Sequence, residues 1–386
     1  MRYICPALVA TLALAGTSFA ATINVPGDYA TIQGAIDASS NGDVIAIAAG
    51  TYYEHSLNPD GKAITIGSAS GNLDVTIDAQ QGGSVFFIWS GEEESTVIRD
   101  LVITGGSTSY HGGGIYCEYS NPIILNCMIM GNTSEDEGGG IYCDYYSKPT
   151  ISHCIISDNS AKYGAGISCR NGSDPTIGNC TITGNSSIYG GGGIRCMFNS
   201  SPAILSCTIS NNNSDSSSGG GIYCFSSSSP MILNSVIEGN TAGGGGGGMY
   251  FINCIPTLTL CTIKNNTSQY DGGGILCYDD GSGQVPTLAL TSVCGNTPNQ
   301  IYDSWDDFFG NTVNNECTFS TTGPCCVTSG CTSLYEAQCA DLGGTWLGEG
   351  DSCEDCPASC TGDLDNNGIV NIDDVLGVIG AWGVCP

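Results

Sequence analysis

A short phrase that recurs about every 26 residues constrains the fold of this 386-residue chain more than any other feature of it. The phrase is Gly, an aliphatic residue, a variable residue and usually Cys. Its aliphatic position advances by 26, 26, 27, 28, 27 and 26 residues through Ile115, Ile141, Ile167, Ile194, Ile222, Met249 and Ile275. A second phrase keeps step with it and places an Asn three residues after an aliphatic residue, at Asn132, Asn159, Asn185, Asn212, Asn240, Asn266 and Asn296. Two phrases that stay in phase predict a solenoid, in which each unit packs on its neighbours.

The residue types within a unit decide which kind of solenoid this is. Each unit is rich in Gly and β-branched residues, segments such as 125–129 alternate in polarity as strands do, and no run keeps a helical period. We therefore predict an all-β fold, a right-handed parallel β-helix over residues 21–300, with regular repeats at about 105–296. Residues 31–38 have apolar side chains at helical spacing behind a Thr, which predicts a short helix that caps the N-terminal end.

In the first phrase, the aliphatic residue and the Cys are expected to point into the core. Stacking then produces two interior cysteine columns, Cys117, Cys143, Cys169, Cys196, Cys224 and Cys277 in one, and Cys127, Cys154, Cys180, Cys207 and Cys261 in the other. Neighbours in a column would lie about 4.8 Å apart, wider than the Cβ separation of a relaxed disulfide. Buried free thiols are therefore favoured over disulfides along the columns. The repeated Asn is expected to bond from coil to coil at an inward corner.

The residue between the aliphatic position and the Cys is expected to point outward. Four tyrosines occupy this outward column, and further aromatic residues, Tyr119, Tyr145 and Phe225, flank it. An exposed aromatic stripe is a candidate surface for stacking sugar rings. The alternative is that tyrosine is simply favoured on a strand face. The candidate glycan-stacking residues are Tyr116, Tyr142, Tyr223 and Tyr250.

Residues 1–20 have a positive start, an apolar core and a small-residue cleavage pattern, which together predict a signal peptide. No second stretch is apolar for long enough to span a membrane. The chain contains 8 Lys and Arg against 37 Asp and Glu, a net charge of −29, which disfavours nucleic acid as a partner. We expect a secreted, extracellular or cell-surface protein whose partners include cations, calcium above all.

The composition changes after the repeats, and two further segments are predicted. Residues 301–360 are rich in cysteine and indicate a small module held by disulfides. Nine cysteines follow from Cys317 onward, so one of them is either free or paired with Cys294. Residues 361–386 contain an EF-hand-type loop, whose spacing predicts one calcium ion bound by oxygen atoms. Its expected ligands are the side chains of Asp363, Asp365, Asn367 and Asp374, the carbonyl of Ile369 and a water held by Asn371.

Several of these segments resemble known families. Residues 25–33, 42–45, 50–52 and 62–66 resemble the start of pectate-lyase-like β-helix proteins, and the repeats are similar to those of chlamydial polymorphic outer-membrane proteins. The EF-hand-type loop, with Asp at its last position and an apolar helix over 375–382, resembles one half of a type I dockerin. The resemblance implies a cohesin-like protein partner, although a full dockerin has two such loops.

No catalytic residue is assigned from the sequence. Lyases of this fold require a basic residue beside carboxylates, and the only arrangement of that kind is Arg195 in the outward column, one coil from Asp174. The preferred interpretation is a secreted or surface-attached, non-catalytic β-helix that binds a polysaccharide, a cell-surface glycan or another extracellular surface. The alternative is a polysaccharide-degrading enzyme, a lyase or a glycoside hydrolase, that carries a dockerin-like module.

Overall fold

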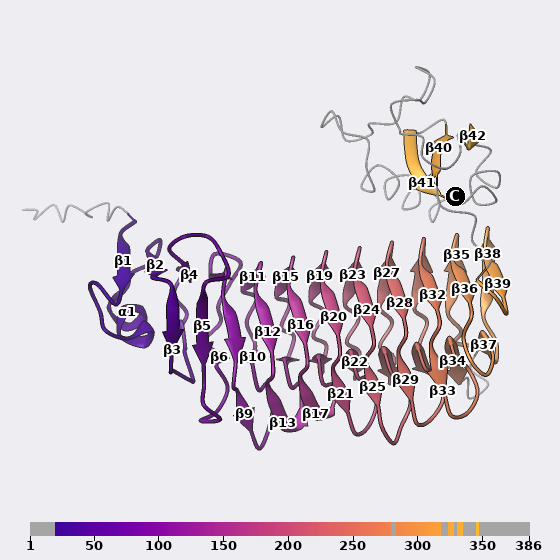
Figure 1. Ribbon diagram of the computed structural model, residues 1–386, viewed down its shortest axis with the longest axis horizontal. Coiled ribbons are helices and arrows are strands. Elements are labelled where there is room, and N and C mark those ends of the chain that lie inside the picture. Colours follow the sequence, from indigo (N-terminus) through magenta and orange to yellow (C-terminus); the bar gives the residue numbers. More distant parts are fainter. Residues whose placement is uncertain (1–19, 279–282, 318–322, 328–329, 335–344, 347–386) are drawn as a thin grey trace, which may run out of the picture.

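The computed structural model describes residues 20–278, 283–317, 323–327, 330–334 and 345–346. Its body is a solenoid of short parallel strands that stack along one axis (Figure 1). The predicted all-β parallel solenoid is confirmed. Within the described residues, no helix is both long and apolar enough to cross a membrane.

Four parallel sheets run along the axis. Sheet A contains β1 (Thr22–Val25), β2 (Val44–Ile47), β4 (Thr65–Ser68), β7 (Val97–Arg99), β11 (Ile123–Leu125), β15 (Thr150–Ser152), β19 (Thr176–Gly178), β23 (Ala203–Leu205), β27 (Met231–Leu233), β31 (Thr257–Thr259), β35 (Thr287–Ala289) and β38 (Asp306–Phe309). Sheet B contains β3 (Gly50–Tyr52), β5 (Val75–Asp78), β8 (Val102–Thr104), β12 (Met128–Met130), β16 (Ile155–Ser157), β20 (Thr181–Thr183), β24 (Thr208–Ser210), β28 (Val236–Glu238), β32 (Thr262–Lys264), β36 (Ser292–Cys294) and β39 (Thr312–Asn314).

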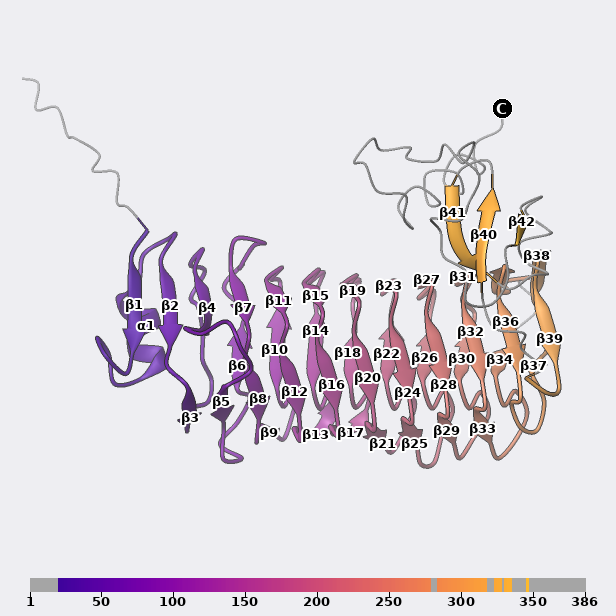
Figure 2. The ribbon, with the colours of Figure 1, turned by 45° about the horizontal axis from the view of Figure 1, so that its top comes forward.

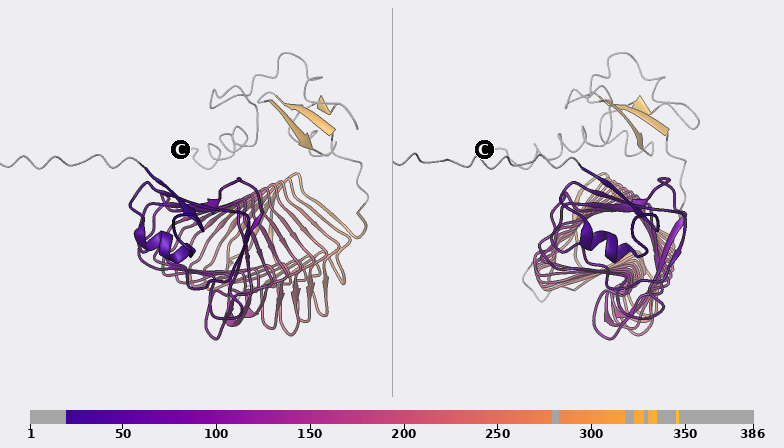
Figure 3. Two further views of the ribbon diagram at one scale, coloured as in Figure 1. Left: turned by 60° about the vertical axis from the view of Figure 1, so that its left-hand side comes forward. Right: turned by 90° about the vertical axis from the view of Figure 1, so that its left-hand side faces the viewer.

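The other two sheets position the candidate site. Sheet C contains β6 (Phe86–Ile88), β10 (Ile115–Glu118), β14 (Ile141–Asp144), β18 (Ile167–Cys169), β22 (Ile194–Met197), β26 (Ile222–Phe225), β30 (Met249–Ile252), β34 (Ile275–Tyr278) and β37 (Ile301–Tyr302). Sheet D contains β9 (Ser107–Thr108), β13 (Thr133–Glu137), β17 (Ser160–Tyr163), β21 (Ser186–Ser187), β25 (Asn213–Ser214), β29 (Thr241–Ala242) and β33 (Thr267–Ser268). Sheet D and the glycine-rich segments after it form a ridge along one edge of the molecule (Figure 3).

The repeat register is confirmed by the strand pairing. Ile115, Ile141 and Ile167 are direct partners across sheet C, and the column continues through Ile194, Ile222, Met249 and Ile275. All seven side chains are fully buried. The predicted cysteine columns are buried as well, and every cysteine in them is free. The core of the solenoid therefore consists of aliphatic side chains and free thiols.

The repeated Asn residues form a continuous ladder where sheet B passes to sheet D. Asn159 Nδ2 donates to Asn185 Oδ1 at 3.0 Å, and the same contact joins each Asn to the next. The ladder ends where Asn296 Nδ2 donates to Gln300 Oε1 at 2.8 Å. The expected coil-to-coil bonding is therefore confirmed, and it satisfies backbone groups at a buried corner.

The two ends of the solenoid differ. Helix α1 (Ile32–Ala38) lies across the N-terminal end, with the side chain of Thr31 accepting a hydrogen bond from the N–H of Gly34 (Figure 3). At the other end, strands β37 to β39 continue the sheets as far as Asn314, so the expected end at residue 300 is too early.

Further along the chain, β40 (Gly323–Val327), β41 (Gly330–Leu334) and β42 (Thr345–Trp346) form a separate antiparallel sheet. These strands lie within the segment that the sequence marks as a cysteine-rich module.

Candidate functional site

The outward residues of sheet C form one row along the solenoid axis, where its strands lie side by side (Figure 2). The register pairs Tyr116 with Tyr142 and Tyr223 with Tyr250, so the four predicted tyrosines share this row. Ser168 and Arg195 stand between the two pairs. The row is therefore aromatic at both ends and polar in the middle.

The prediction that this row of tyrosines is exposed is wrong. Tyr142 is fully buried, and Tyr116, Tyr223 and Tyr250 are half-buried. The cause is the ridge, whose glycine-rich segments return over the row. At Gly138, where φ is +68°, an added Cβ would lie 2.7 Å from the Cβ of Tyr142. Little surface of these tyrosines remains for stacking a ligand.

The hydroxyl groups of two of the covered tyrosines, Tyr116 and Tyr142, are satisfied by carboxylates two residues further along the strand. Tyr116 Oη donates to Glu118 Oε2 at 2.6 Å, and Tyr142 Oη donates to Asp144 Oδ2 at 2.9 Å. Burial, together with these carboxylates, raises the pKa of both tyrosines far above the ordinary value of 10. Asp144 also accepts a hydrogen bond from Asn171 Nδ2 at 2.7 Å. These contacts hold the carboxylates in fixed positions on the outer face of sheet C.

A second set of aromatic side chains follows the strands of sheet C, and these are exposed. Their exposed fractions are 56% for Trp89, 56% for Tyr119, 41% for Tyr145, 68% for Tyr146 and 36% for Phe198. We call these five residues the edge aromatics. The rings of Tyr119 and Tyr145 stack with their centres 5.1 Å apart. The backbone is left-handed at Tyr119, Tyr145 and Phe198, which turns the chain out of sheet C. The flanking residues Tyr119 and Tyr145, rather than the predicted column, therefore provide the exposed aromatic surface.

Beside the edge aromatics lies a buried charge cluster around Glu137, which is only 4% exposed. Oε1 of Glu137 lies 3.0 Å from Nη1 of Arg170 and 3.0 Å from Nη1 of Arg195. Its other oxygen accepts a hydrogen bond from Ser168 Oγ at 2.9 Å. One carboxylate at the foot of the ridge therefore links two coils of sheet C.

The two arginines of this cluster differ in access. Arg195 is 9% exposed, and its guanidinium lies 4.4 Å from the centre of the Tyr163 ring. The Arg170 side chain is 34% exposed, and its guanidinium lies 5.1 Å from the centre of the Phe198 ring. Burial by itself would lower the pKa of Arg170, but the carboxylate of Glu137 reverses this, and the pKa is raised. Of the two, Arg170 is the one that faces the edge aromatics.

The sequence placed Asp174 near Arg195, but the structure does not pair these two residues. Asp174 pairs with Lys148, at 3.3 Å, and Arg195 pairs with Glu137 instead. Sequence spacing did not identify Glu137, because that residue reaches sheet C from the ridge of another coil.

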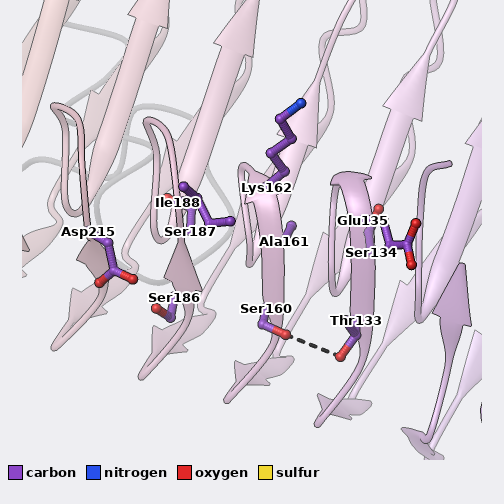
Figure 4. A pocket seen from close by; sticks show the side chains of 10 residues that line it. All are labelled: Thr133, Ser134, Glu135, Ser160, Ala161, Lys162, Ser186, Ser187, Ile188 and Asp215. Atoms are coloured by element: carbon purple, nitrogen blue, oxygen red, sulfur yellow. Dashed lines mark hydrogen bonds between the residues drawn. The ribbon is translucent and has the colours of Figure 1, made fainter. Parts of the chain in front are cut away.

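The outer face of sheet D carries an open depression of about 450 Å³ (Figure 4). Hydroxyl groups line it, and those of Thr133 and Ser160 lie 3.1 Å apart. Lys162 is the one cation among its lining residues, with Glu135 on the preceding coil and Asp215 two coils further along. No aromatic ring lines this depression, so it offers less stacking surface than the edge of sheet C.

The structure places no metal ligand set in the part of the chain that it describes. Among those residues, no group of three or more His, Cys, Asp and Glu side chains is arranged to hold a metal ion. The predicted calcium ligands Asp363, Asp365, Asn367, Ile369, Asn371 and Asp374 all lie outside the described residues.

In this fold, the strands of successive coils pair in parallel along one axis. That arrangement defines a parallel β-helix protein, here with a ridge beside the outward face of sheet C. Residues 56–201 and 186–317 each match the family model described as a right-handed β-helix region. The chain therefore belongs to the right-handed β-helix family. No curated protein matches it.

The chain is also similar to several solved structures. The chain is similar to the pectate lyase Pel9A, with 14% identity and a TM-score of 0.50, over 79% of this chain and 82% of that one. It is also similar to the Aspergillus niger pectin methylesterase, with 14% identity and a TM-score of 0.33, over 79% and 92%. The periplasmic alginate epimerase AlgG gives 12% identity and a TM-score of 0.37, over 76% and 82%. At 14% identity, the likeness to Pel9A extends to the fold alone.

Proposed function

We propose that this protein is an exported, non-catalytic β-helix that binds a neutral polysaccharide or cell-surface glycan through its edge aromatics. The observation that carries the proposal is the exposure of Trp89, Tyr119, Tyr145 and Phe198 along one edge of sheet C. Isolated exposed aromatic rings need no explanation, but a row of them on one side of a rigid sheet is a surface suited to sugar rings.

The spacing and the charge of this surface indicate the kind of glycan. Successive coils lie about 4.8 Å apart, close to the length of one sugar in an extended chain. A glycan parallel to the axis would meet a ring on three consecutive coils, at Trp89, Tyr119 and Tyr145, and another at Phe198 two coils further on. Glu118 and Arg170 stand beside the rings as hydrogen-bonding groups. The net charge of −29 repels polyanions, which favours a neutral polymer.

Affinity electrophoresis against a panel of neutral glycans, with polygalacturonate as the acidic comparison, tests the proposal. Tyr119→Ala and Tyr145→Ala should each weaken binding about fivefold, because each removes about 1 kcal/mol of ring stacking. Tyr270→Ala is the matched control, since Tyr270 is 64% exposed but stands at the ridge. Retention by no neutral glycan, or an equal loss in the control variant, would contradict the proposal.

A polysaccharide-degrading enzyme is the second candidate, and the nearness of Arg170 to the edge aromatics favours it. Arg195 is too buried to reach a polymer, so it is not proposed as a base. We expect no unsaturated product from polygalacturonate with calcium present, and no catalytic change in Arg195→Ala. An activity that is lost in Arg170→Lys but kept in Arg195→Lys would establish the enzyme instead.

We further propose that the C-terminal loop binds one calcium ion through Asp363, Asp365, Asn367, Asp374, the carbonyl of Ile369 and a water held by Asn371. Support comes from the ligand spacing, which is that of an EF-hand loop with Gly at the sharp turn. A cohesin-like protein is the proposed partner of this segment. Calorimetry on the full chain should show a calcium site that Asp363→Ala with Asp374→Ala abolishes, while the solenoid melts as before. Unchanged affinity in the double variant would place the ion elsewhere.

A further inference from the structure

The interior of the solenoid contains an unusual number of reduced thiols. In the described part of the chain, twelve cysteines are free and all twelve are buried. Cys117, Cys143 and Cys169 are direct partners across sheet C, and the column continues to Cys196 and Cys224. The second column begins at Cys127 and follows the turn between sheets A and B.

The second column shows that sulfur is not required by the fold. The N–H of Cys127 donates to Cys154 Sγ at 3.4 Å, and the N–H of Cys154 donates to Cys180 Sγ at 3.4 Å. Further along, Ser235 Oγ accepts the same bond from the N–H of Cys207, at 3.1 Å. Thr291 Oγ1 accepts it from the N–H of Cys261, at 3.3 Å. Hydroxyl side chains therefore occupy the same position as the thiols and make the same contact.

The stacking also explains why neighbouring thiols stay unbonded. Paired strands lie about 4.8 Å apart, whereas a relaxed disulfide needs Cβ atoms about 3.8 Å apart. Cys294 and Cys317, at the C-terminal end, are joined by a disulfide. One protein thus holds an oxidised pair at its end and reduced thiols in its core, and the fold itself separates the two states.

The short separation in sequence between the two cysteines of one coil determines which disulfide can form when that coil unfolds. Each of four coils contributes one cysteine to each column, and the two lie 10 or 11 residues apart, at Cys117 and Cys127, Cys143 and Cys154, Cys169 and Cys180, and Cys196 and Cys207. In the folded state the two members stand in different sheets or turns of the coil. In an open chain, so short a loop closes in about 10 to 100 ns, and both thiols are exposed.

We propose that the solenoid is a redox lock: while closed it keeps its column cysteines reduced, and once opened in oxidising surroundings it is trapped open by disulfides within single coils. The oxidant is a small disulfide such as oxidised glutathione. A thiolate of the open coil attacks it, which forms a mixed disulfide and releases one glutathione thiol. The second cysteine of the coil then attacks the mixed disulfide, forms the intrachain bond and releases the second thiol. Two electrons pass from the cysteine pair to the oxidant.

Burial explains why the column cysteines stay reduced in the folded solenoid. Burial raises the pKa of the Cys117 thiol well above its ordinary value, so the reactive thiolate is suppressed while the coil is closed. Opening removes that protection. The intracoil bond then prevents refolding, because its two sulfur atoms must return to different columns of the core.

The experiment uses the full-length protein in two arms. In the first, iodoacetamide is applied to the folded protein and to the protein in guanidinium chloride, and labelled peptides are identified by mass spectrometry. We expect the column cysteines to be labelled only after unfolding. Rapid labelling of the columns in folded protein, or native disulfides between column members, would overturn the proposal.

In the second arm, the protein is unfolded and refolded with either a dithiol reductant or oxidised glutathione, after matched times. We expect recovery of the native circular dichroism with reductant and at least a fivefold lower recovery with oxidised glutathione. Disulfides joining Cys143 to Cys154 and Cys169 to Cys180 should appear in the trapped fraction. Equal recovery of the native circular dichroism under both conditions would contradict the proposal.

A double variant that copies the natural Ser235 into two other coils provides the control. Cys154→Ser with Cys180→Ser removes one partner from two coils while keeping the hydrogen-bonding position filled, and it should refold better in oxidised glutathione than the unaltered protein does. No improvement in a variant that folds would contradict the intracoil pairing. If the variant does not fold, identification of the trapped disulfides in the unaltered protein decides the same point.

Discussion

At the scale of single residues, the ladder asparagines stabilise three coils at once. Asn185 Oδ1 accepts from both the N–H of Asn159, at 3.1 Å, and its Nδ2, at 3.0 Å. Asn185 Nδ2 in turn donates to the carbonyl of Ile156 at 2.9 Å. Because every ladder asparagine is buried, each of these polar groups would cost about 1 to 3 kcal/mol if left unpaired. The repeat of Asn therefore reflects a hydrogen-bonding requirement.

The aliphatic column allows a sharp test at the same scale. Ile167 is fully buried between Ile141 and Ile194, its partners on the neighbouring coils. We expect Ile167→Asp to prevent folding, because it leaves a carboxylate in the core with no partner, at a cost of several kcal/mol. Soluble yield and thermal unfolding by circular dichroism measure this. Thr176→Asp is the control, since Thr176 is exposed on the same coil and its variant should fold. Equal stability of the two variants would mean that the register is wrong.

At the scale of elements, the ridge decides what sheet C presents to a ligand. Strand β14 and its neighbours have the alternation expected of a half-exposed sheet, yet the segments after sheet D cover the first outward row. The next turn of the chain, at Tyr119 and Tyr145, remains open. A side chain that alternation assigns to the outer face is therefore not necessarily exposed to solvent.

The last coil depends on a covalent link. A disulfide joins Cys294, at the end of β36, to Cys317, 23 residues later and just after β39. Closing a loop of this length is worth about 3 kcal/mol, so reduction should loosen the terminal coil rather than the solenoid. Hydrogen exchange should accelerate at Thr312–Asn314 in a reductant, or in Cys317→Ser, and stay slow at Ile167. Loss of protection at both places together would show that the link stabilises the whole body.

At the scale of the whole molecule, the buried thiols and tyrosines make stability depend on alkaline pH. Burial raises the pKa of Cys117 and Tyr142, and it also raises the pKa of Cys224, Cys261 and Cys277, so the folded protein keeps protons that the unfolded chain loses. The stabilisation is complete below about pH 8.5, the ordinary thiol pKa, and is lost as the pH rises above it.

We therefore expect the midpoint of thermal unfolding to fall steeply between about pH 8 and pH 10, in reductant to exclude disulfide formation. For each buried thiol, the free energy of unfolding falls by up to about 1.4 kcal/mol for each pH unit above the pKa of that thiol in the unfolded chain. The Cys154→Ser, Cys180→Ser variant should show a shallower fall. A midpoint that does not change over this range would mean that the columns are open to solvent.

The sequence by itself determined the solenoid, because its period is written in residues that each coil needs: an aliphatic anchor, a thiol and a ladder Asn. These contacts join residues at a nearly constant spacing, so a local pattern is enough to predict them. The register of Ile115 on Ile141 followed from the repeat period, and the free state of the stacked cysteines followed from the strand spacing. Only the tertiary structure decided which outward residues meet solvent and which charges meet each other. Tyr142 is covered and Glu137 reaches both Arg170 and Arg195 because the ridge folds back over sheet C, a contact between turns whose path no repeat period specifies.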